Sequence, residues 1–158
     1  MNSRVLAGLL KRVYPNFDMT TFENRFKLQK FVYFLKMWKL ELGYDFRVYL
    51  YGPYSSELAN DGFQINDIKS YDEIQFEDSV MEASFLNFLS FFNNYKEDLE
   101  FLELGSSIHI LLNIDSNINK EDLISLIEHK RENIKVDKIH FNFVFNTLIE
   151  KGLVIYNE

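Results

Sequence analysis

The sequence predicts a mainly α-helical fold with two short strand regions. Apolar residues recur at three- and four-residue spacing through most of the chain, which is the pattern of helices with a buried face. Only two prolines and six glycines interrupt 158 residues, so long regular segments are favoured over a loop-rich scaffold. Two short runs, at 46–51 and 153–156, are instead rich in β-branched and aromatic residues, as strands are.

The first predicted helix covers residues 3–14. Its apolar residues follow helical spacing, and Ser3 is the expected N-cap. Pro15 ends it, because the residue before a proline is disfavoured in the α region.

The second predicted helix begins at a cap, Thr20 or Thr21, and runs to about Leu42, where Gly43 supplies the stop. A helical wheel places apolar residues on two opposite sides of it. A helix of this kind is normally central and packed from both directions.

The 46–51 run alternates and is predicted to be a strand that Gly52-Pro53 ends. Ser55 is the expected cap of a following helix, which the turn signal at 60–62 keeps short. Residues 64–79 hold five acids and have no clean period, so they are predicted to be a connection.

Further helices are predicted after Val80, with one apolar stripe over 81–92 and a second over 99–112 that kinks near Gly105. Asn119 is expected to cap the next helix, and Gly152 to end the last. The order of helix, helix, helix and strand over 97–156 is that of a winged-helix-like unit.

These elements predict two modules in one compact unit. An N-terminal helical module covers 1–64, an acidic connection covers 65–79, and a winged-helix-like module covers 80–158. Charge follows a similar division, since residues 1–54 carry a formal charge of +5 and residues 55–158 one of −12. Such a split suits an anionic partner on one face, or the two segments neutralise each other within the fold.

Catalysis and cofactor binding are not expected. The chain has no cysteine, which excludes disulfides, thiolate metal sites and cysteine nucleophiles. Its three histidines lie in separate segments without metal-ligand spacing, and the phosphate-binding and nucleophile-elbow motifs are absent. A small enzyme built on Arg25, Lys30 and Tyr54 is the weakest hypothesis.

No membrane association is expected. No stretch of the sequence approaches the roughly 18 apolar residues that a spanning helix needs. The N-terminal apolar patch is also too short for a secretory signal. A cytoplasmic location follows as the expectation.

Two motifs stand out, and together they resemble a known family. The first is Arg25-Phe26-Lys27-Leu28-Gln29-Lys30 with the apolar residues and Tyr33 that follow, and the second is the segment from Tyr49 to Leu58, which contains Tyr51-Gly52-Pro53-Tyr54-Ser55. Over residues 22–60 the pair resembles the bacterial and archaeal YwgA-like proteins and, more distantly, the Panacea domain of SocA-like antitoxins. The resemblance implies a helical, winged-helix-like regulator or antitoxin relative that binds a toxin and neutralises it or delivers it to a protease.

The favoured hypothesis is therefore a non-enzymatic protein-interaction module, antitoxin-like, adaptor-like or a defence-associated accessory factor, with a toxin or effector as partner. Rigidly held tyrosines beside a basic helix suit a peptide, another protein or an exposed base. The predicted partner-binding residues are Arg25, Lys27, Lys30, Tyr33, Lys36, Tyr51, Tyr54 and Ser55. Surplus aromatic surface makes a homodimer compatible with the sequence.

The alternative is a winged-helix transcriptional regulator that binds DNA. Its recognition helix lies around 138–151, where the candidate readers are Lys138, His140, Asn142, Asn146 and Lys151. Against this hypothesis, no arginine lies among them, although Arg and Lys dominate base and phosphate contacts. The isoelectric point near 5.0 also disfavours an unaided DNA binder.

Overall fold

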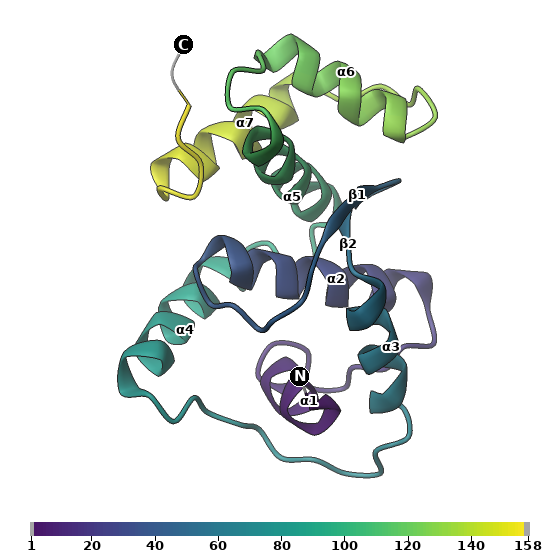
Figure 1. The fold of residues 1–158 in the computed structure, drawn as a ribbon, viewed down its shortest axis with the longest axis vertical. Helices are drawn as coiled ribbons and strands as arrows, with labels where there is room; N and C mark the ends of the chain where they lie inside the picture. The colour runs from purple at the N-terminus through teal and green to yellow at the C-terminus, as the bar shows by residue number, and fades with distance from the viewer. Residues whose placement is uncertain (1, 157–158) are drawn as a thin grey trace. The chain divides into compact units, whose positions relative to one another are not determined.

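The computed structural model describes residues 2–156 and is mainly helical, with seven helices and one two-stranded antiparallel hairpin in that range (Figure 1). None of these helices combines the length and the apolar character needed to cross a bilayer. The elements are α1 (Ser3–Lys11), α2 (Phe22–Met37), β1 (Arg47–Tyr49), β2 (Gly52–Tyr54), α3 (Ser56–Ile65), α4 (Ser79–Phe92), α5 (Leu99–Ile114), α6 (Lys120–Lys130) and α7 (Lys138–Glu150).

The chain folds into two compact units that are interleaved in sequence. The first comprises residues 1–45 and 55–97, and the second comprises 46–54 and 98–158. These units are defined by packing and do not coincide with the modules at 1–64 and 80–158. The division into an N-terminal and a C-terminal module stays a prediction.

Helix α1 begins at Ser3, where the predicted range begins, but has a different cap and ends three residues earlier than predicted. Asn2, not Ser3, is the N-cap, and its side chain accepts a hydrogen bond from the Arg4 amide at 2.8 Å. The helix ends at Lys11, well before Pro15.

Helix α2 begins at the predicted cap Thr21, which accepts a hydrogen bond from the Asn24 amide. It ends at Met37, so the predicted extension to Leu42 is wrong. Lys39 adopts a left-handed conformation with φ 67°, and the Leu40 amide donates to the Leu35 carbonyl at 2.9 Å. With the bond from the Lys39 amide to the Lys36 carbonyl, this arrangement is a Schellman cap. The sequence does not indicate the cap, because its left-handed residue is a lysine and not the usual glycine.

The first unit is built around α2, whose residues from Lys27 to Leu35 are all buried. This agrees with the predicted central position. Aromatic side chains join α2 to α4: Phe31 lies 5.9 Å from Phe92, and Trp38 stacks on Phe91 at 5.4 Å between ring centroids. Helix α3 packs against both α1 and α2.

Helix α3 has the predicted Ser55 cap, but the expected stop at residues 60–62 is wrong, because the helix continues through Gly62 to Ile65. Gly62 is a packing residue. A Cβ built on it would lie 2.5 Å from Leu28 Cδ2 and 2.8 Å from Met19 Cε, so the missing side chain lets these neighbours pack against α3.

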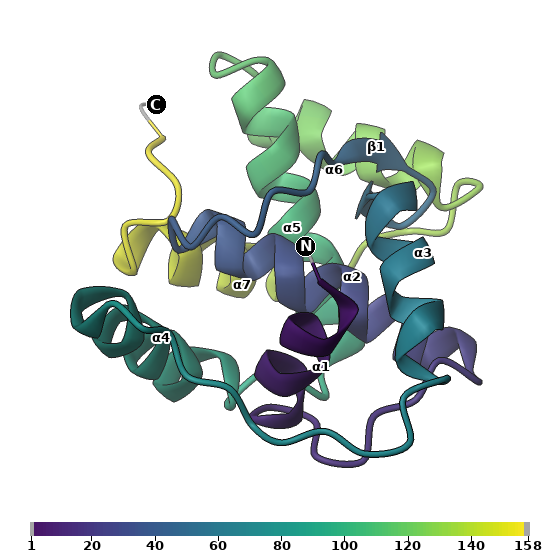
Figure 2. The same cartoon turned by 60° about the horizontal axis from the view of Figure 1, so that its bottom comes forward.

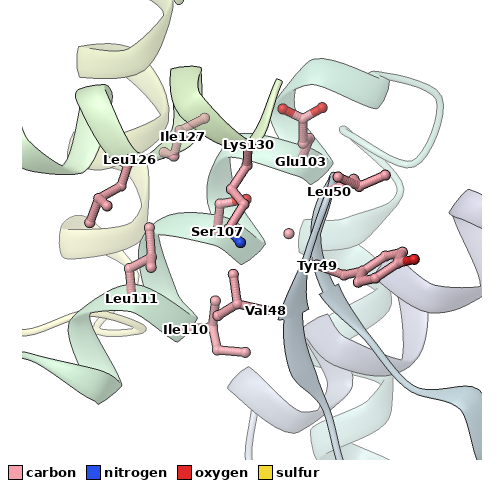
Figure 3. A pocket seen from close by; sticks show the side chains of 11 residues that line it. Val48, Tyr49, Leu50, Glu103, Ser107, Ile110, Leu111, Leu126, Ile127 and Lys130 are labelled. Atoms are coloured by element: carbon pink, nitrogen blue, oxygen red, sulfur yellow. The ribbon is translucent and has the colours of Figure 1, made fainter. Parts of the chain in front are cut away.

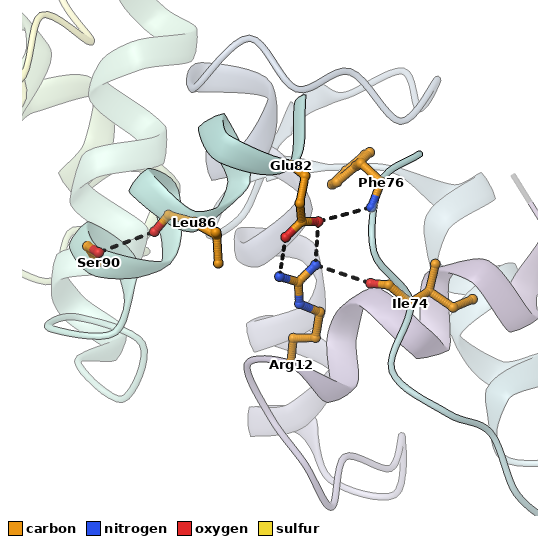
Figure 4. Close-up of polar contacts among 6 residues, drawn as sticks. All are labelled: Arg12, Ile74, Phe76, Glu82, Leu86 and Ser90. Atoms are coloured by element: carbon orange, nitrogen blue, oxygen red, sulfur yellow. Dashed lines mark hydrogen bonds and ion pairs between the residues drawn. The ribbon is translucent and has the colours of Figure 1, made fainter. Parts of the chain in front are cut away.

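Residues 66–78 form the predicted connection, without a helix or strand, and run beside α1 (Figure 2). The Ile74 amide donates to the Gly8 carbonyl at 3.2 Å. Arg12 donates to the Ile74 carbonyl and binds the Glu82 carboxylate through both terminal nitrogens, at 2.6 and 2.8 Å (Figure 4). The connection therefore belongs to the packed first unit.

The β-hairpin corrects the prediction that Gly52-Pro53 ends the strand region. These two residues begin β2, and β1 pairs with β2 through Arg47 with Tyr54, Val48 with Pro53, and Tyr49 with Gly52. Gly52 supplies the positive φ of 94° that the tight turn requires. Proline is tolerated because it sits in a short edge strand.

The second unit is centred on α5, which contacts β1, β2, α6 and α7. Asn119 caps α6 as predicted, and Gly152, with φ 69°, follows the end of α7 as predicted. The predicted strand at 153–156 is wrong, because the Leu153 amide bonds back to the Leu148 carbonyl and Tyr156 packs edge-on against Phe145. This segment folds back on α7 and has no strand partner within 2–156.

Candidate functional site

The outer face of the hairpin combines exposed tyrosine and arginine side chains. Alternation along the paired strands places Arg47, Tyr49 and Tyr54 on one face and Val48 and Pro53 on the other. Burial follows this division, since the first three side chains are exposed and Pro53 is buried. We call Arg47, Tyr49 and Tyr54 the outer face.

The two tyrosines of the outer face lie against each other while staying open to solvent. Their ring centroids are 5.5 Å apart and the rings are tilted by 36°. Tyr49 is 58% exposed and Tyr54 is 40% exposed. Paired rings of this kind offer a rigid apolar area with two hydroxyls at its margin.

The opposite side of β1 borders a recess of about 370 Å³, including its solvent-open part (Figure 3). Helix α5 and helix α6 supply most of the remaining wall, which is largely apolar. The lining residues are Val48, Tyr49, Leu50, Gly52, Glu103, Ser107, Ile110, Leu111, Leu126, Ile127 and Lys130. The Val48 side chain points toward Ile110, whereas the Tyr49 ring points to the other side of the strand (Figure 3).

The charged groups around the recess leave it with a positive margin. Glu103 is bound by the Nε of Arg131, and both side chains are nearly buried, at 13% and 11% exposure. Lys130 extends from α6 into the recess and is exposed (Figure 3). Because Glu103 is already neutralised, Lys130 sets the charge that a group bound in the recess would meet.

The predicted partner-binding residues divide into exposed and buried groups. Tyr54 lies on the outer face, and Tyr51 lies at the hairpin turn with 45% of its surface exposed. Arg25 and Lys36 are half-buried, and Arg25 donates to the Met19 carbonyl at 3.0 Å. The four buried residues are Lys27, Lys30, Tyr33 and Ser55.

The basic residues of α2 form internal contacts in the first unit. Lys27 binds Glu97 and, at 3.1 Å, Glu23. Burial acts to lower the pKa of Lys27, but the hydrogen bonds to Glu97 and Glu23 outweigh it and raise that pKa above its ordinary value. The Lys30 amine lies 5.1 Å from the centroid of the Phe26 ring. Burial also raises the pKa of the Tyr33 hydroxyl.

The two sequence motifs meet through Gln29. Its amide nitrogen donates to the Ser55 carbonyl and its amide oxygen accepts from the Ser55 amide, both at 2.9 Å. Both residues are buried. The side chain of Gln29 thus bonds to both the N–H and the C=O of one residue, Ser55, which gives the motif pair a structural role.

The candidate DNA-reading residues lie along α7 and just after it. Lys138, Asn142, Asn146 and Lys151 are exposed, whereas His140 is half-buried with its Nδ1 3.6 Å from a Glu100 carboxylate oxygen. The same exposed side of α7 carries Ile139 and Phe143, which are 84% and 52% exposed. The structure therefore brings these readers onto one helix together with large apolar side chains.

Sequence reasoning missed Arg47, Tyr49 and Lys130 as site residues. A signal for the first two was present in the alternation of 46–51, which places residues 47 and 49 on one side of a strand. No signal indicated Lys130, because its position beside β1 depends on the packing of α6 against α5.

No metal centre is found in the described part of the chain, since no three His, Asp or Glu side chains gather there in a way that could hold an ion. The three histidines do not form a cluster. Comparison with family models, curated proteins and solved structures gives no match for this chain.

Proposed function

We propose that this protein is a non-enzymatic interaction module that binds a protein partner through the outer face of its hairpin. The observation that carries the proposal is the exposure of Arg47, Tyr49 and Tyr54 on one face of a short sheet. Tyrosine and arginine are among the residues that contribute most to binding energy at protein interfaces.

The hairpin is also stiff, which lowers the entropic cost of binding. Pro53 has a fixed φ, and both Gly52 and Pro53 are buried. Strand β2 contacts α5 within the second unit. A surface that is ordered before binding loses less conformational freedom when a partner docks.

The class of partner follows from the resemblance of residues 22–60 to YwgA-like proteins and, more distantly, to Panacea domains. We propose on that basis a toxin or effector as the partner, and an antitoxin, adaptor or defence-associated role for the chain. The exposed apolar side chains of α7 are compatible with a homodimer.

Affinity capture from the source organism tests the proposal. Wild-type protein, a Tyr49→Ala/Tyr54→Ala variant and a Phe63→Ala variant are compared, and captured proteins are identified by mass spectrometry. Phe63 is a matched control because it is a half-exposed aromatic residue on α3. We expect a partner that the Phe63→Ala variant retains and the double tyrosine variant binds at least about tenfold more weakly.

The proposal fails if wild-type protein captures no partner, or if loss of both tyrosines leaves the captured set unchanged.

A winged-helix DNA-binding regulator is the second candidate. It is favoured by the exposure of Lys138, Asn142, Asn146 and Lys151 along one helix, and by the order of α5, α6 and α7. Against it, Ile139 and Phe143 occupy the same exposed side and offer no contact to phosphates. We rank it below the interaction module.

A further inference from the structure

The hydrogen-bond pattern of the hairpin can be assigned from its proline. In an antiparallel pair, opposite residues alternate between exchanging both backbone hydrogen bonds and exchanging none. Val48 faces Pro53, which has no N–H, so this pair must be the one that exchanges none. The pairs on either side, Arg47 with Tyr54 and Tyr49 with Gly52, therefore hold the hairpin together.

It follows that Val48 directs its N–H and C=O away from β2. Within residues 2–156 the sheet contains only β1 and β2, so no third strand takes up these groups. An outward-pointing donor and acceptor on an edge strand form the docking point for an extended segment of another chain.

The surroundings of β1 specify the chemistry of such a segment. The recess beside β1 is apolar where Val48, Ile110 and Leu126 line it, and it accommodates a hydrophobic side chain. Its exposed cation is Lys130, because Arg131 already binds Glu103. Since residues two apart on a strand point to the same face, one segment can direct both a hydrophobic and an acidic side chain toward the recess.

We propose that the partner binds as an extended acidic and hydrophobic segment that adds to the edge of β1. Its backbone pairs with Val48, a hydrophobic side chain enters the recess, and an acidic side chain faces Lys130. This inference rests on the proposed interaction function and adds the conformation and charge of the bound segment.

A fluorescein-labelled hexapeptide, Thr-Leu-Thr-Glu-Thr-Leu with blocked ends, is the probe, because its Leu and Glu side chains share one face of a strand. Its binding to the full chain is measured by fluorescence anisotropy, beside a Leu/Lys hexapeptide and a Leu/Glu peptide with N-methylated backbone. We expect the unmodified Leu/Glu peptide to bind and both control peptides to bind at least about tenfold more weakly.

Three variants test the individual contacts. Val48→Pro removes the outward N–H without touching the ladder to β2, and should weaken binding about tenfold. Lys130→Glu should abolish the preference for the acidic peptide, whereas Lys138→Glu, at an exposed site on α7, should leave it intact. Leu126→Ala should weaken binding, whereas Leu86→Ala, at an exposed leucine on α4, should not.

Several results would overturn the inference. They are no binding of the Leu/Glu peptide by wild-type protein, equal binding of the Leu/Lys peptide, and unchanged binding by a folded Val48→Pro variant. If Val48→Pro does not fold, Lys130→Glu decides alone, because that side chain is exposed. If light scattering shows a dimer that Val48→Pro breaks and no peptide binds, a second copy occupies the edge and the acidic segment is excluded.

The inference and the proposed function fail separately. A captured partner that is lost with Tyr49 and Tyr54 but retained by Val48→Pro keeps the interaction function and removes strand addition. Absence of any captured partner removes the function itself.

Discussion

The side-chain amide of Gln29 bonds to the backbone of Ser55 as a neighbouring strand would. Ser55 connects β2 to α3, and its buried N–H and C=O have no partner in a sheet. The Gln29 amide supplies a donor and an acceptor, and bonds to both at 2.9 Å. The Ser55 carbonyl also accepts from the Ala59 amide at 3.1 Å, so the buried Ser55 N–H is the group that Gln29 keeps from being unpaired, which would be costly.

Replacing Gln29 with leucine should therefore destabilise the protein. We expect the free energy of unfolding to fall by about 2 kcal/mol, because the buried Ser55 N–H loses its partner while the Ser55 carbonyl keeps its hydrogen bond from the Ala59 amide. Urea denaturation measures the change. Gln64→Leu is the control, since Gln64 is an exposed glutamine that accepts from the Ser3 hydroxyl, and it should change stability by less than about 0.5 kcal/mol. Equal effects of the two substitutions would contradict the role given to Gln29.

Glu82 should make stability depend on pH in the acid range. Its hydrogen bonds to Arg12, with a further one from the Phe76 amide, lower the pKa of Glu82 below its ordinary value of 4.5. A carboxyl with a lower pKa in the folded state stabilises the fold above the unfolded-state pKa. That stabilisation is lost as the pH falls through the folded-state pKa.

The stability difference between wild type and Glu82→Gln should thus be largest at about pH 7 and shrink below pH 4.5. Urea denaturation of both proteins across this range measures it. Glu41→Gln, at an exposed glutamate, should show a much smaller dependence on pH. A difference that stays constant down to about pH 3 would show that the Arg12–Glu82 pair does not depend on the charge of Glu82.

At the scale of elements, two glycines allow helices and loops to pack closely. A Cβ on Gly8 of α1 would lie 2.5 Å from Ile74 Cγ1 and 2.9 Å from the backbone oxygen of Asp72. A Cβ on Gly62 would meet only the ends of the Leu28 and Met19 side chains, which can move. The Asp72 backbone, which a Cβ on Gly8 would approach, has less freedom to move aside than these side-chain ends.

Gly8→Ala should consequently cost more stability than Gly62→Ala, although alanine favours both helices by about 1 kcal/mol. We expect a net loss of about 2 kcal/mol for Gly8→Ala and a loss nearer zero for Gly62→Ala. Thermal unfolding compares the two, and limited proteolysis should cut residues 66–78 faster in Gly8→Ala. Equal stability of the two variants would mean that the connection adapts freely.

The same glycines show which parts of the fold could be predicted. Caps at Thr21, Ser55 and Asn119 could be predicted, because a short polar side chain before an apolar run satisfies the first helical amides. The helix stop predicted at Gly62 is wrong. The sequence alone does not distinguish a glycine that ends a helix from one that makes room for a neighbouring side chain.

Local pattern also could not find the whole candidate site. The motif predicts Tyr54 as a partner-binding residue, and Tyr54 is exposed. Lys27 and Ser55 are also predicted partner-binding residues, but both are buried. Whether a basic residue on a helix is exposed or paired internally depends on what packs against that helix. Lys27 is paired with Glu97, which is far away in the sequence, so no local spacing indicates the pair.

Across the whole molecule, charges that are segregated along the chain are mixed in space. Arg12 binds Glu82 and Lys27 binds Glu97, so cations of the first third meet acids from later segments of the same unit. Lys11 is likewise engaged by the Tyr71 carbonyl at 2.9 Å. The basic first third is thus partly neutralised by contacts within the first unit.

Binding to nucleic acid should accordingly be weak. We expect a dissociation constant above about 10⁻⁴ M for random duplex and single-stranded DNA at physiological salt, because Arg12 and Lys27 are paired internally and the chain carries a formal net charge of −7. Fluorescence anisotropy at two salt concentrations, with light scattering on the same sample, measures it. Tight binding that weakens steeply with salt and is lost in Lys138→Glu would instead support the regulator.

Pro53 has a further consequence for how the protein behaves when concentrated. Sheets grow into fibres when every chain offers two edges, one to receive a strand and one to pass the pairing on. Here the second edge carries a residue that cannot donate, and β2 is packed against α5. Any strand added at Val48 therefore ends the array, so we expect a stoichiometry of one partner per chain without polymerisation.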